Sequence, residues 1–275
     1  MRYLRWTAVI VFILSFALSC VVNIQYNAEQ DTNPPTITSD TEELEVSVES
    51  DQDALLQGLT AHDEKDGDLT DKILVASISR FLEPGTVRVK YVVFDSNHNA
   101  ATYTRKVRYT DYVPPRFSLQ SPLVYTRGQN IRYLNYITAK DVLDGDITDR
   151  IKVKASNVSN YTPGTYPVLL EVANSRGDTV QVELNVVVLD KNTDTARITL
   201  KEYLTYIKTG DSFDPYRCIS SVTMLNGIAL SATDVSILGT VDTEEPGCYD
   251  LIYRYNKDGI EASAYLTVVV EEQEG

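Results

Sequence analysis

The sequence is poor in the side chains on which most enzymes and metal sites depend. It contains 2 His, 1 Trp and 3 Cys in 275 residues. These counts leave little material for His-dependent catalysis, a zinc site or a dense disulfide scaffold. Basic residues are also scarce, with 25 Lys and Arg against 39 Asp and Glu and a net charge of −14. Because such a chain repels phosphates, we expect no nucleic-acid binding, and we expect no enzymatic activity.

The residues that are abundant favour folded β structure. Hydrophobic residues make up 43% of the chain, which is enough for packed cores, and Tyr (18) greatly outnumbers Phe (6). Tyr has an apolar ring and a polar tip, so it suits half-exposed β surfaces. The length alone would suggest about two domains. The internal repeats described below change that expectation to three.

The N-terminus has the features of a membrane anchor. Arg2 and Arg5 come before an apolar run over residues 6–22, and no charged residue lies between Arg5 and Glu29. At about 1.5 Å per helical residue, the uncharged stretch can cross a hydrocarbon core of about 30 Å. Cationic residues on the N-terminal side place the remainder outside the cytoplasm. Residues 1–30 are therefore predicted to form a cytoplasmic stub, a transmembrane signal-anchor and a short linker.

Two other interpretations of this segment stay open. Residues 17–19 (Ala-Leu-Ser) resemble a signal-peptide cleavage site, and cleavage would give a secreted protein. Cys20 also allows a lipoprotein, although Leu18 lies two residues before it, one residue out of the usual register. All three interpretations place the chain from about residue 30 onward outside the cytoplasm.

The remainder of the chain is a threefold repeat. Residues 66–73 (Asp-Gly-Asp-Leu-Thr-Asp-Lys-Ile) recur at 144–151 as Asp-Gly-Asp-Ile-Thr-Asp-Arg-Ile. Pro-Gly-Thr at 84–86 recurs at 163–165, and again at 246–248 as Pro-Gly-Cys. The repeats divide the chain into units over residues 31–110, 111–190 and 191–275, the last with a short acidic tail.

Each unit has the pattern of β structure. Residues 87–93 alternate between apolar and polar side chains, as a half-buried strand requires. Residues 166–172 and 249–255 occupy the same place in the other units, and each run is followed by a turn rich in Asn, Asp and Gly. About seven short strands in roughly 80 residues fit a β-sandwich. The predicted fold class is all-β.

The repeated motifs resemble a known family. The pattern Ala-x-Asp-x-x-Asp-Gly-Asp-(Leu/Ile)-Thr, followed by Pro-Gly-Thr, is similar to bacterial Ig-like domains of Gram-positive surface proteins. The Ig-like modules of some insecticidal crystal proteins and hyalin-type repeats are also similar. The resemblance covers residues 31–190 well, and the third unit more loosely, because residues 224–230 replace the acidic motif. It implies three tandem Ig-like sandwiches that serve as stalks, spacers or contact elements and share no enzymatic activity.

The two acidic motifs have two interpretations. Carboxylates at alternating positions around a Gly turn suit calcium, a cation that takes 6–8 oxygen ligands. The simpler interpretation, which we favour, is that Asp-Gly makes a tight turn and the other carboxylates accept backbone hydrogen bonds. Otherwise we expect no cofactor. The candidate calcium ligands are Asp63, Asp66, Asp68, Asp71, Asp141, Asp144, Asp146 and Asp149.

The third unit contains two cysteines. Cys248 replaces the Thr of the Pro-Gly-Thr motif, and Cys218 lies near the strand position held by Leu59 and Ile137 in the other units. If the two strands face each other, a disulfide closing about 30 residues would stabilise the unit by about 3–4 kcal/mol. We predict this disulfide, with a pair of reactive thiols as the alternative.

Three smaller motifs have ordinary explanations. Arg176-Gly177-Asp178 spells an adhesion tripeptide, but the repeat places a hairpin turn there. His62 and His98 are expected in exposed loops, and the sequons at 157–159 and 160–162 are expected to be unmodified in a bacterial protein.

These features together predict a membrane-anchored bacterial surface protein. It would be a single-pass protein with its C-terminal part extracellular, and it would act as a non-enzymatic Ig-like stalk or interaction module. Its partners would be the membrane, through residues 6–22, and an extracellular protein or carbohydrate. The alternative is a calcium-dependent adhesive or self-associating module that uses the acidic loops. We place ligand contact in the third unit, which has many aromatic side chains that also fit ordinary strands: Tyr203, Tyr206, Tyr216, Tyr249, Tyr253 and Tyr255.

Overall fold

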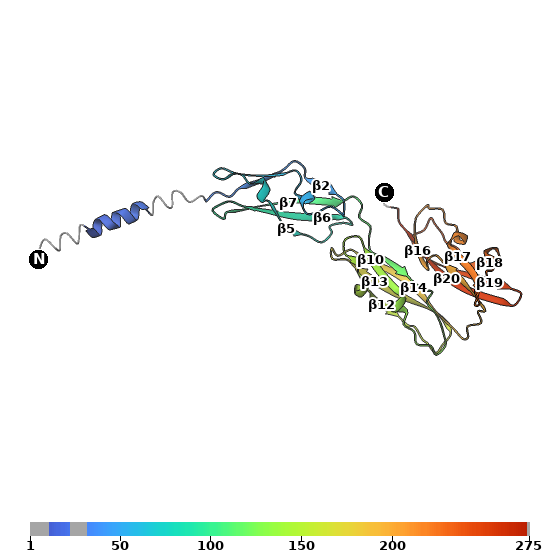
Figure 1. Ribbon diagram of the computed structural model, residues 1–275. Helices are drawn as coiled ribbons and strands as arrows, with labels where there is room; N and C mark the ends of the chain where they lie inside the picture. Colours follow the sequence, from blue (N-terminus) through green and yellow to red (C-terminus); the bar gives the residue numbers. More distant parts are fainter. Residues whose placement is uncertain (1–10, 23–31, 274–275) are drawn as a thin grey trace. The chain divides into compact units, whose positions relative to one another are not determined.

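The computed structural model describes residues 11–22 and 32–273, as one helix and three β-sandwiches (Figure 1). The prediction of an all-β fold after residue 30 is confirmed. The chain divides into two compact units, Met1–Asp111 and Tyr112–Gly275. Unit 1 contains the first sandwich, and unit 2 contains the second and third. The expected boundaries of three separate domains stay a prediction.

Residues 11–22 form an α-helix whose side chains are all exposed. Within residues 11–22 and 32–273, no helix is both long and apolar enough to cross a bilayer. The predicted span over residues 6–22 begins in residues 1–10, and the predicted linker lies in residues 23–31. Both of these segments are outside the described residues, so the transmembrane anchor stays a prediction.

The first sandwich packs a sheet of three strands against a sheet of four. The smaller sheet has the order β1 (Thr36–Ser39), β3 (Leu59–Asp63), β4 (Gly67–Asp68). The larger has the order β2 (Glu43–Val46), β7 (Ala100–Tyr109), β6 (Thr86–Phe94), β5 (Leu74–Ile78). Along β6, Val87, Val89, Tyr91 and Val93 are fully buried, as the alternation in the sequence predicts. Short 3-10 helices cover Asp53–Leu56 (η1) and Thr70–Lys72 (η2).

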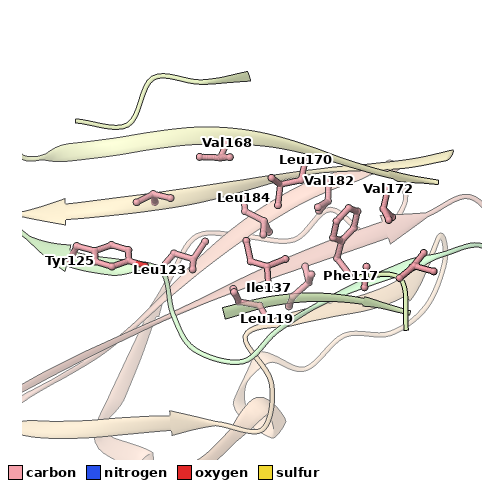
Figure 2. Close-up of a cluster of buried hydrophobic side chains, with 14 residues drawn as sticks. Phe117, Leu119, Leu123, Tyr125, Ile137, Val168, Leu170, Val172, Val182 and Leu184 are labelled. Atoms are coloured by element: carbon pink, nitrogen blue, oxygen red, sulfur yellow. The ribbon is translucent and has the colours of Figure 1, made fainter. Parts of the chain in front are cut away.

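The second sandwich repeats this arrangement. Its sheets have the orders β11 (Gly145–Asp146), β10 (Ile137–Asp141), β8 (Arg116–Leu119) and β12 (Lys152–Ser156), β13 (Gly164–Ala173), β14 (Thr179–Leu189), β9 (Val124–Thr126). The 3-10 helices are η3 (Tyr133–Tyr136) and η4 (Thr148–Arg150). Figure 2 shows its core, in which Leu170 and Leu184 of the larger sheet face Phe117 and Ile137 of the smaller one.

The third sandwich has a reduced smaller sheet of two strands, β15 (Ala196–Leu200) and β17 (Ile219–Met224). Its larger sheet has the order β16 (Leu204–Lys208), β20 (Ile260–Glu271), β19 (Gly247–Lys257), β18 (Val235–Leu238). The 3-10 helices are η5 (Pro215–Cys218) and η6 (Ala232–Asp234). Each sandwich therefore has a hydrophobic cluster, and that of the second also includes Leu204 of the third.

All three sandwiches share one feature of topology. The first strand of each pairs in the smaller sheet, and the next strand crosses to the larger sheet. There it runs parallel to the last strand of its sandwich, as in the pairs β2–β7, β9–β14 and β16–β20. The remaining pairs are antiparallel, so this crossing strand joins the beginning of each sandwich to its end.

Candidate functional site

The two acidic motifs fold into the same loop, at the end of β3 and of β10. The Asp63 carboxylate is 3% exposed and accepts hydrogen bonds from the backbone N–H groups of Lys65 and Asp66, both at 2.9 Å. Asp141 accepts the equivalent bonds from the backbone N–H groups of Leu143 and Asp144, at 2.9 and 3.0 Å. The Gly of each Asp-Gly pair has a positive φ of 77° or 70°, which explains why Gly occurs there.

The second carboxylate of each motif ties this loop to a hairpin of the other sheet. Asp66 accepts from the backbone N–H and the hydroxyl of Ser96, at 2.6 and 2.9 Å. Asp144 accepts the same two bonds from Ser175, at 2.6 and 2.7 Å. The bonds from Ser96 hold the pKa of Asp66 below its usual value. Burial acts to raise the pKa of Asp144, but the bonds from Ser175 and Arg150 outweigh it and the pKa is lowered.

The third carboxylate closes the loop locally. Asp68 and Asp146 accept the backbone N–H of Thr70 and Thr148, each at 2.9 Å. Hydrogen bonds from the side chains of these threonines, together with the backbone bonds, lower the pKa of both carboxyl groups. The Thr70 hydroxyl then accepts from the backbone N–H of Ala61 at 3.1 Å. This arrangement supports the interpretation of the motif as a hydrogen-bonded turn.

The calcium prediction for the eight carboxylates stays a prediction. The structure brings the first three members of each motif into one loop and directs them at backbone N–H groups. Asp71 and Asp149 are exposed and lie on η2 and η4. Over residues 11–22 and 32–273, no group of three or more His, Cys, Asp or Glu side chains is arranged to hold a metal ion.

The predicted disulfide between Cys218 and Cys248 is wrong, because both thiols are free. Along β19, Leu251, Tyr253 and Tyr255 point into the core. Cys248 lies an odd number of residues from each of them, so its side chain points outward. Cys218 ends η5 and lies against the hydrophobic cluster of the third sandwich, near the Tyr253 hydroxyl. The two thiols thus lie on opposite faces of β19. Burial raises the pKa of the Cys218 thiol.

The smaller motifs have structural roles. In the Arg176-Gly177-Asp178 tripeptide, the Asp178 carboxylate accepts a hydrogen bond of 2.6 Å from the Tyr112 hydroxyl. The backbone N–H groups of Arg176 and Asp178 both donate to the Asn174 side chain, at 3.0 Å. His98 lies at an exposed hairpin tip with a φ of 68°, as expected. His62 is exposed too, but it lies on strand β3 and not in the expected loop.

Sequence reasoning missed a contact between the second and third sandwiches, within unit 2. The backbone N–H of Phe117 on β8 donates to the Tyr206 hydroxyl on β16, at 3.0 Å. The Arg116 guanidinium lies 4.9 Å from the centroid of the Tyr206 ring and forms an ion pair with Glu271 at 2.5 Å. We call the set of Arg116, Phe117, Tyr206 and Glu271 the closed contact. Only the abundance of Tyr in the third unit pointed toward it.

The closed contact belongs to a larger junction, in which the larger sheet of the third sandwich meets strands of both sheets of the second. Leu204 on β16 is 4% exposed and packs into the hydrophobic cluster of the second sandwich. The Asn185 amide on β14 donates to the Asp250 carboxylate on β19. These contacts explain why the second and third sandwiches form one compact unit.

The junction encloses two adjoining spaces. An inner cavity of about 80 Å³ has mostly apolar walls, which include Leu119, Leu123 and Ile252. An outer space of about 590 Å³, which we call the junction cleft, lies between β9 of the second sandwich and β15 of the third. Tyr203, Tyr265 and Pro122 line both spaces. The junction cleft is the candidate ligand site of unit 2.

The other tyrosines of the third unit are mostly structural. Tyr253 and Tyr255 are buried in the core, and the Tyr253 hydroxyl donates to the Pro215 carbonyl at 2.8 Å. The Tyr249 hydroxyl donates to the carbonyl of Glu245, also at 2.8 Å. Tyr216 is 54% exposed. Of the six, Tyr203 and Tyr206 contribute to the junction.

Comparison with known proteins gives one curated relative and many solved structures. The pesticidal crystal protein Cry22Aa of Bacillus thuringiensis is 29% identical over 221 residues, which cover 77% of this chain. This chain spans only 29% of the length of that protein. One similar structure is the M60 catalytic domain with two CBM51 domains of Clostridium perfringens ZmpB, at 13% identity, 87% of this chain, 31% of that one and a TM-score of 0.25. Another is Drosophila N-cadherin EC1-4, at 12% identity, 89% and 76% coverage and a TM-score of 0.22.

The family comparison gives a match in the unit that carries the repeated motifs least well. Residues 200–270 fit the model described as a bacterial Ig-like domain, group 3. These residues begin at the end of β15 and extend to the last strand of the third sandwich. The resemblance to bacterial Ig-like domains expected from the sequence is therefore confirmed, and the family match lies in the third sandwich.

Proposed function

We propose that this protein is a membrane-anchored, non-enzymatic interaction module of the bacterial cell surface, which presents Ig-like sandwiches to an extracellular protein or carbohydrate. The observation that carries the proposal is the combination, in one chain, of an apolar helix exposed on every side and tandem acidic Ig-like sandwiches. The sandwiches close their own cores and need no support from the helix.

The helix supports the membrane part of the proposal. Eight of its large apolar side chains are exposed by 51% to 72%. A helix that is hydrophobic all round is stable only when another apolar phase covers it, because each Å² of apolar surface left in water costs about 25 cal/mol. A lipid bilayer supplies that phase, and the cationic residues Arg2 and Arg5 orient the sandwiches outward. Cleavage near Cys20 would release the same sandwiches outside the cytoplasm, and lipidation at Cys20 would anchor them there.

The loops support a role in contact rather than catalysis. The first three carboxylates of the acidic motif accept backbone hydrogen bonds that hold the loop together. The third sandwich lacks this acidic loop and instead exposes Leu225 by 67% and Ile228 by 56%. Exposed apolar side chains beside a polar rim favour contact with a partner, which agrees with placing the ligand surface in the third sandwich.

The membrane part is tested by fractionation of cells that express the full chain. We expect the chain in the membrane fraction, resistant to alkaline carbonate, with its sandwiches digested when protease is added to intact cells. A chain lacking residues 1–30 is the control and should be soluble. Recovery of the intact full-length chain in the soluble fraction would contradict the anchor, and loss of residues 1–19 with lipid on Cys20 would select the lipoprotein alternative.

The interaction part is tested with the full chain in detergent micelles. Purified cell-wall polysaccharide and defined surface proteins are offered separately, and binding is measured by calorimetry. We expect saturable binding to one of the two classes of ligand. High salt should not abolish this binding, whereas purely electrostatic binding would be screened. If the chain binds neither polysaccharide nor surface protein, the proposed role is contradicted.

A further inference from the structure

The junction of unit 2 uses two strands that occupy equivalent places in their sandwiches. Arg116-Phe117-Ser118-Leu119 on β8 corresponds to Arg197-Ile198-Thr199-Leu200 on β15. Phe117 and Ile198 are both core residues, with exposures of 1% and 3%. Phe117 lies opposite Ala139 of β10, and Ile198 lies opposite Val222 of β17. The second and third sandwiches thus each present an arginine followed by a buried core residue.

The crossing strands β9 and β16 are equivalent as well. The residue after β9, Arg127, donates its backbone N–H to Leu189, and Thr209 after β16 donates to Glu271, both at 2.8 Å. Leu189 and Glu271 are therefore equivalent ends of the last strands. Counting back along the parallel ladders, Val124 opposite Val187 corresponds to Tyr206 opposite Val269.

Because of this correspondence, the junction has two halves that are built from equivalent strands and carry different side chains. In the closed contact, the Tyr206 hydroxyl of the third sandwich accepts the Phe117 N–H of the second, and the Glu271 carboxylate pairs with Arg116. In the other half, the corresponding residues are Val124 and Leu189 of the second sandwich and Ile198 and Arg197 of the third. All four of these line the junction cleft. Valine and leucine supply neither a phenol nor a carboxylate, which explains why this half is open.

The backbone of Ile198 faces the cleft. Val222 accepts a hydrogen bond from Leu230, and Met224 donates one to Ile228, both at 2.8 Å, so these two residues direct their backbone groups away from β15. Neighbouring residues of an antiparallel strand alternate, so Thr223 directs its groups toward Arg197, its partner in the ladder. Ile198, the next residue, then directs its N–H to the other edge. Its side chain is in the core, so it lines the cleft through this edge.

The side chain of Arg197 has no protein partner among the described residues. It is exposed, and within the described part of the chain its guanidinium takes part in no ion pair and no side-chain hydrogen bond. Its counterpart Arg116 has both an aromatic ring and a carboxylate. The cleft therefore combines an open strand edge with a cation that has no protein partner over residues 11–22 and 32–273, and the Asp194 carboxylate also lines it.

We propose that the junction cleft binds an extended peptide segment of a partner protein that carries a tyrosine and a carboxylate side chain two residues apart. The tyrosine hydroxyl accepts the Ile198 N–H, its ring lies under the Arg197 guanidinium, and the carboxylate pairs with Arg197. In the closed contact the phenol comes from β16 and the carboxylate from β20. The residue two places after Tyr206 is the ladder partner of Glu271, so a carboxylate two residues after a tyrosine would lie beside the equivalent place. The inference rests on the proposed function as an interaction module, and it names one binding site and the class of partner.

Two features favour a peptide over a saccharide. The tyrosine hydroxyl takes the Ile198 N–H, and in an extended peptide side chains two residues apart point to the same side, so the tyrosine and the carboxylate both face the edge of β15. Behind the cleft, the inner cavity of about 80 Å³ has mostly apolar walls, so it suits an aliphatic side chain next to the tyrosine. Tyr203 and Tyr265 connect the two spaces.

The test uses a fluorescein-labelled peptide, acetyl-Leu-Thr-Tyr-Ile-Glu-amide, with the full chain in detergent micelles. We expect saturable binding by fluorescence anisotropy. Replacing the peptide tyrosine by phenylalanine should weaken binding about fivefold, the effect of one lost hydrogen bond. Arg197→Ala should weaken it about tenfold or more, because the peptide carboxylate loses its charge-assisted partner. Arg88→Ala, an exposed arginine of the first sandwich, is the matched control and should bind as the unmodified chain does.

A second variant fills the cleft from within. Val124→Tyr with Leu189→Glu rebuilds the side chains of the closed contact in the open half. We expect this variant to lose peptide binding and to melt at a higher temperature than the unmodified chain. If it does not fold, the Arg197→Ala and phenylalanine-peptide measurements decide alone. Equal binding of the peptide to the unmodified chain and Arg197→Ala, or no binding to either, would overturn the proposal.

The outcome is separable from that of the proposed function. Suppose that the polysaccharide or surface protein found by calorimetry binds Val124→Tyr/Leu189→Glu as tightly as the unmodified chain. The interaction-module function then stands and the junction cleft is not its site. Displacement of the labelled peptide by cell-wall polysaccharide would overturn the assignment of a peptide ligand while keeping the cleft.

Discussion

Single carboxylates carry out most of the structural work at the loop ends of the first two sandwiches. Asp66 and Asp144 each join a loop of one sheet to a hairpin of the other, and their partners are a backbone N–H and a serine hydroxyl. The motif could be found in the sequence because it recurs at a fixed offset. Its partners could not, since Ser96 and Ser175 lie about 30 residues away, and although they hold the same place in the two predicted turns, the sequence does not show which loop that place faces.

The lowered carboxyl pKa values predict how stability depends on pH. Asp66, Asp68, Asp144 and Asp146 have lower pKa values in the folded chain than the unfolded value of about 3.9. Their contribution is present above that value and is lost as the pH falls through the folded values, so the melting temperature should fall below about pH 5. Asp66→Asn with Asp144→Asn should flatten this fall in a pH series of thermal melts. Asp71→Asn with Asp149→Asn, on exposed residues, should leave it unchanged.

Calcium provides a separate test of the same loops. The carboxylates already accept backbone N–H groups, so added calcium has to displace these bonds before it gains ligands. We expect no shift of the melting temperature on addition of calcium or of a chelator. A rise with calcium that disappears in Asp66→Asn with Asp144→Asn would instead favour the calcium-dependent adhesive module.

The cysteines show the limit of arguments from spacing. A separation of 30 residues in sequence was compatible with facing strands, but the parity of β19 turns Cys248 outward while Cys218 lies by the core. We expect both thiols to react with Ellman's reagent after unfolding without reductant. In the folded chain Cys218 should react slowly near pH 7, because burial raises its pKa and reduces the thiolate fraction. Cys248→Ser should change the free energy of unfolding by less than about 0.5 kcal/mol, which a broken disulfide would exceed.

Whole elements were easier to predict than their partners. The alternation in residues 87–93 predicted the buried face of β6, and the Asn, Asp and Gly turns predicted the hairpins. The alternation does not show what covers the outer face of a sheet. Leu204 and Tyr206 on β16 look like ordinary strand residues in the sequence, yet they meet another sandwich. The junction was missed for this reason.

The contact of β16 with β8 can be tested by removing a single oxygen atom. Tyr206→Phe removes the acceptor of the Phe117 N–H and leaves that group unsatisfied in a mostly buried place. We expect the free energy of unfolding of unit 2 to fall by about 1–3 kcal/mol. Denaturant unfolding followed by circular dichroism measures it. Tyr216→Phe, on an exposed ring, should change stability by less than about 0.5 kcal/mol.

At the scale of the molecule, the number of packed cores and the number of compact units differ. There are three hydrophobic clusters but two units, because the junction joins the second and third sandwiches. Scanning calorimetry should therefore resolve two transitions, one for unit 1 and one for unit 2. Tyr206→Phe should lower only the transition of unit 2. Three transitions, with the second and third sandwiches melting separately in the unmodified chain, would contradict the coupling.

The crossing strands also set the order in which the chain acquires its structure during synthesis. In each sandwich the strand that crosses to the larger sheet pairs with the last strand, for example Leu44 with Val107 and Thr205 with Val268. A growing chain therefore holds an open, unfinished sheet until the final hairpin has left the ribosome. For unit 2 this wait spans two sandwiches, since Arg116 meets Glu271 only after β20 has been synthesised. Pauses or truncations before the end of β20 should accordingly harm the second sandwich as well as the third.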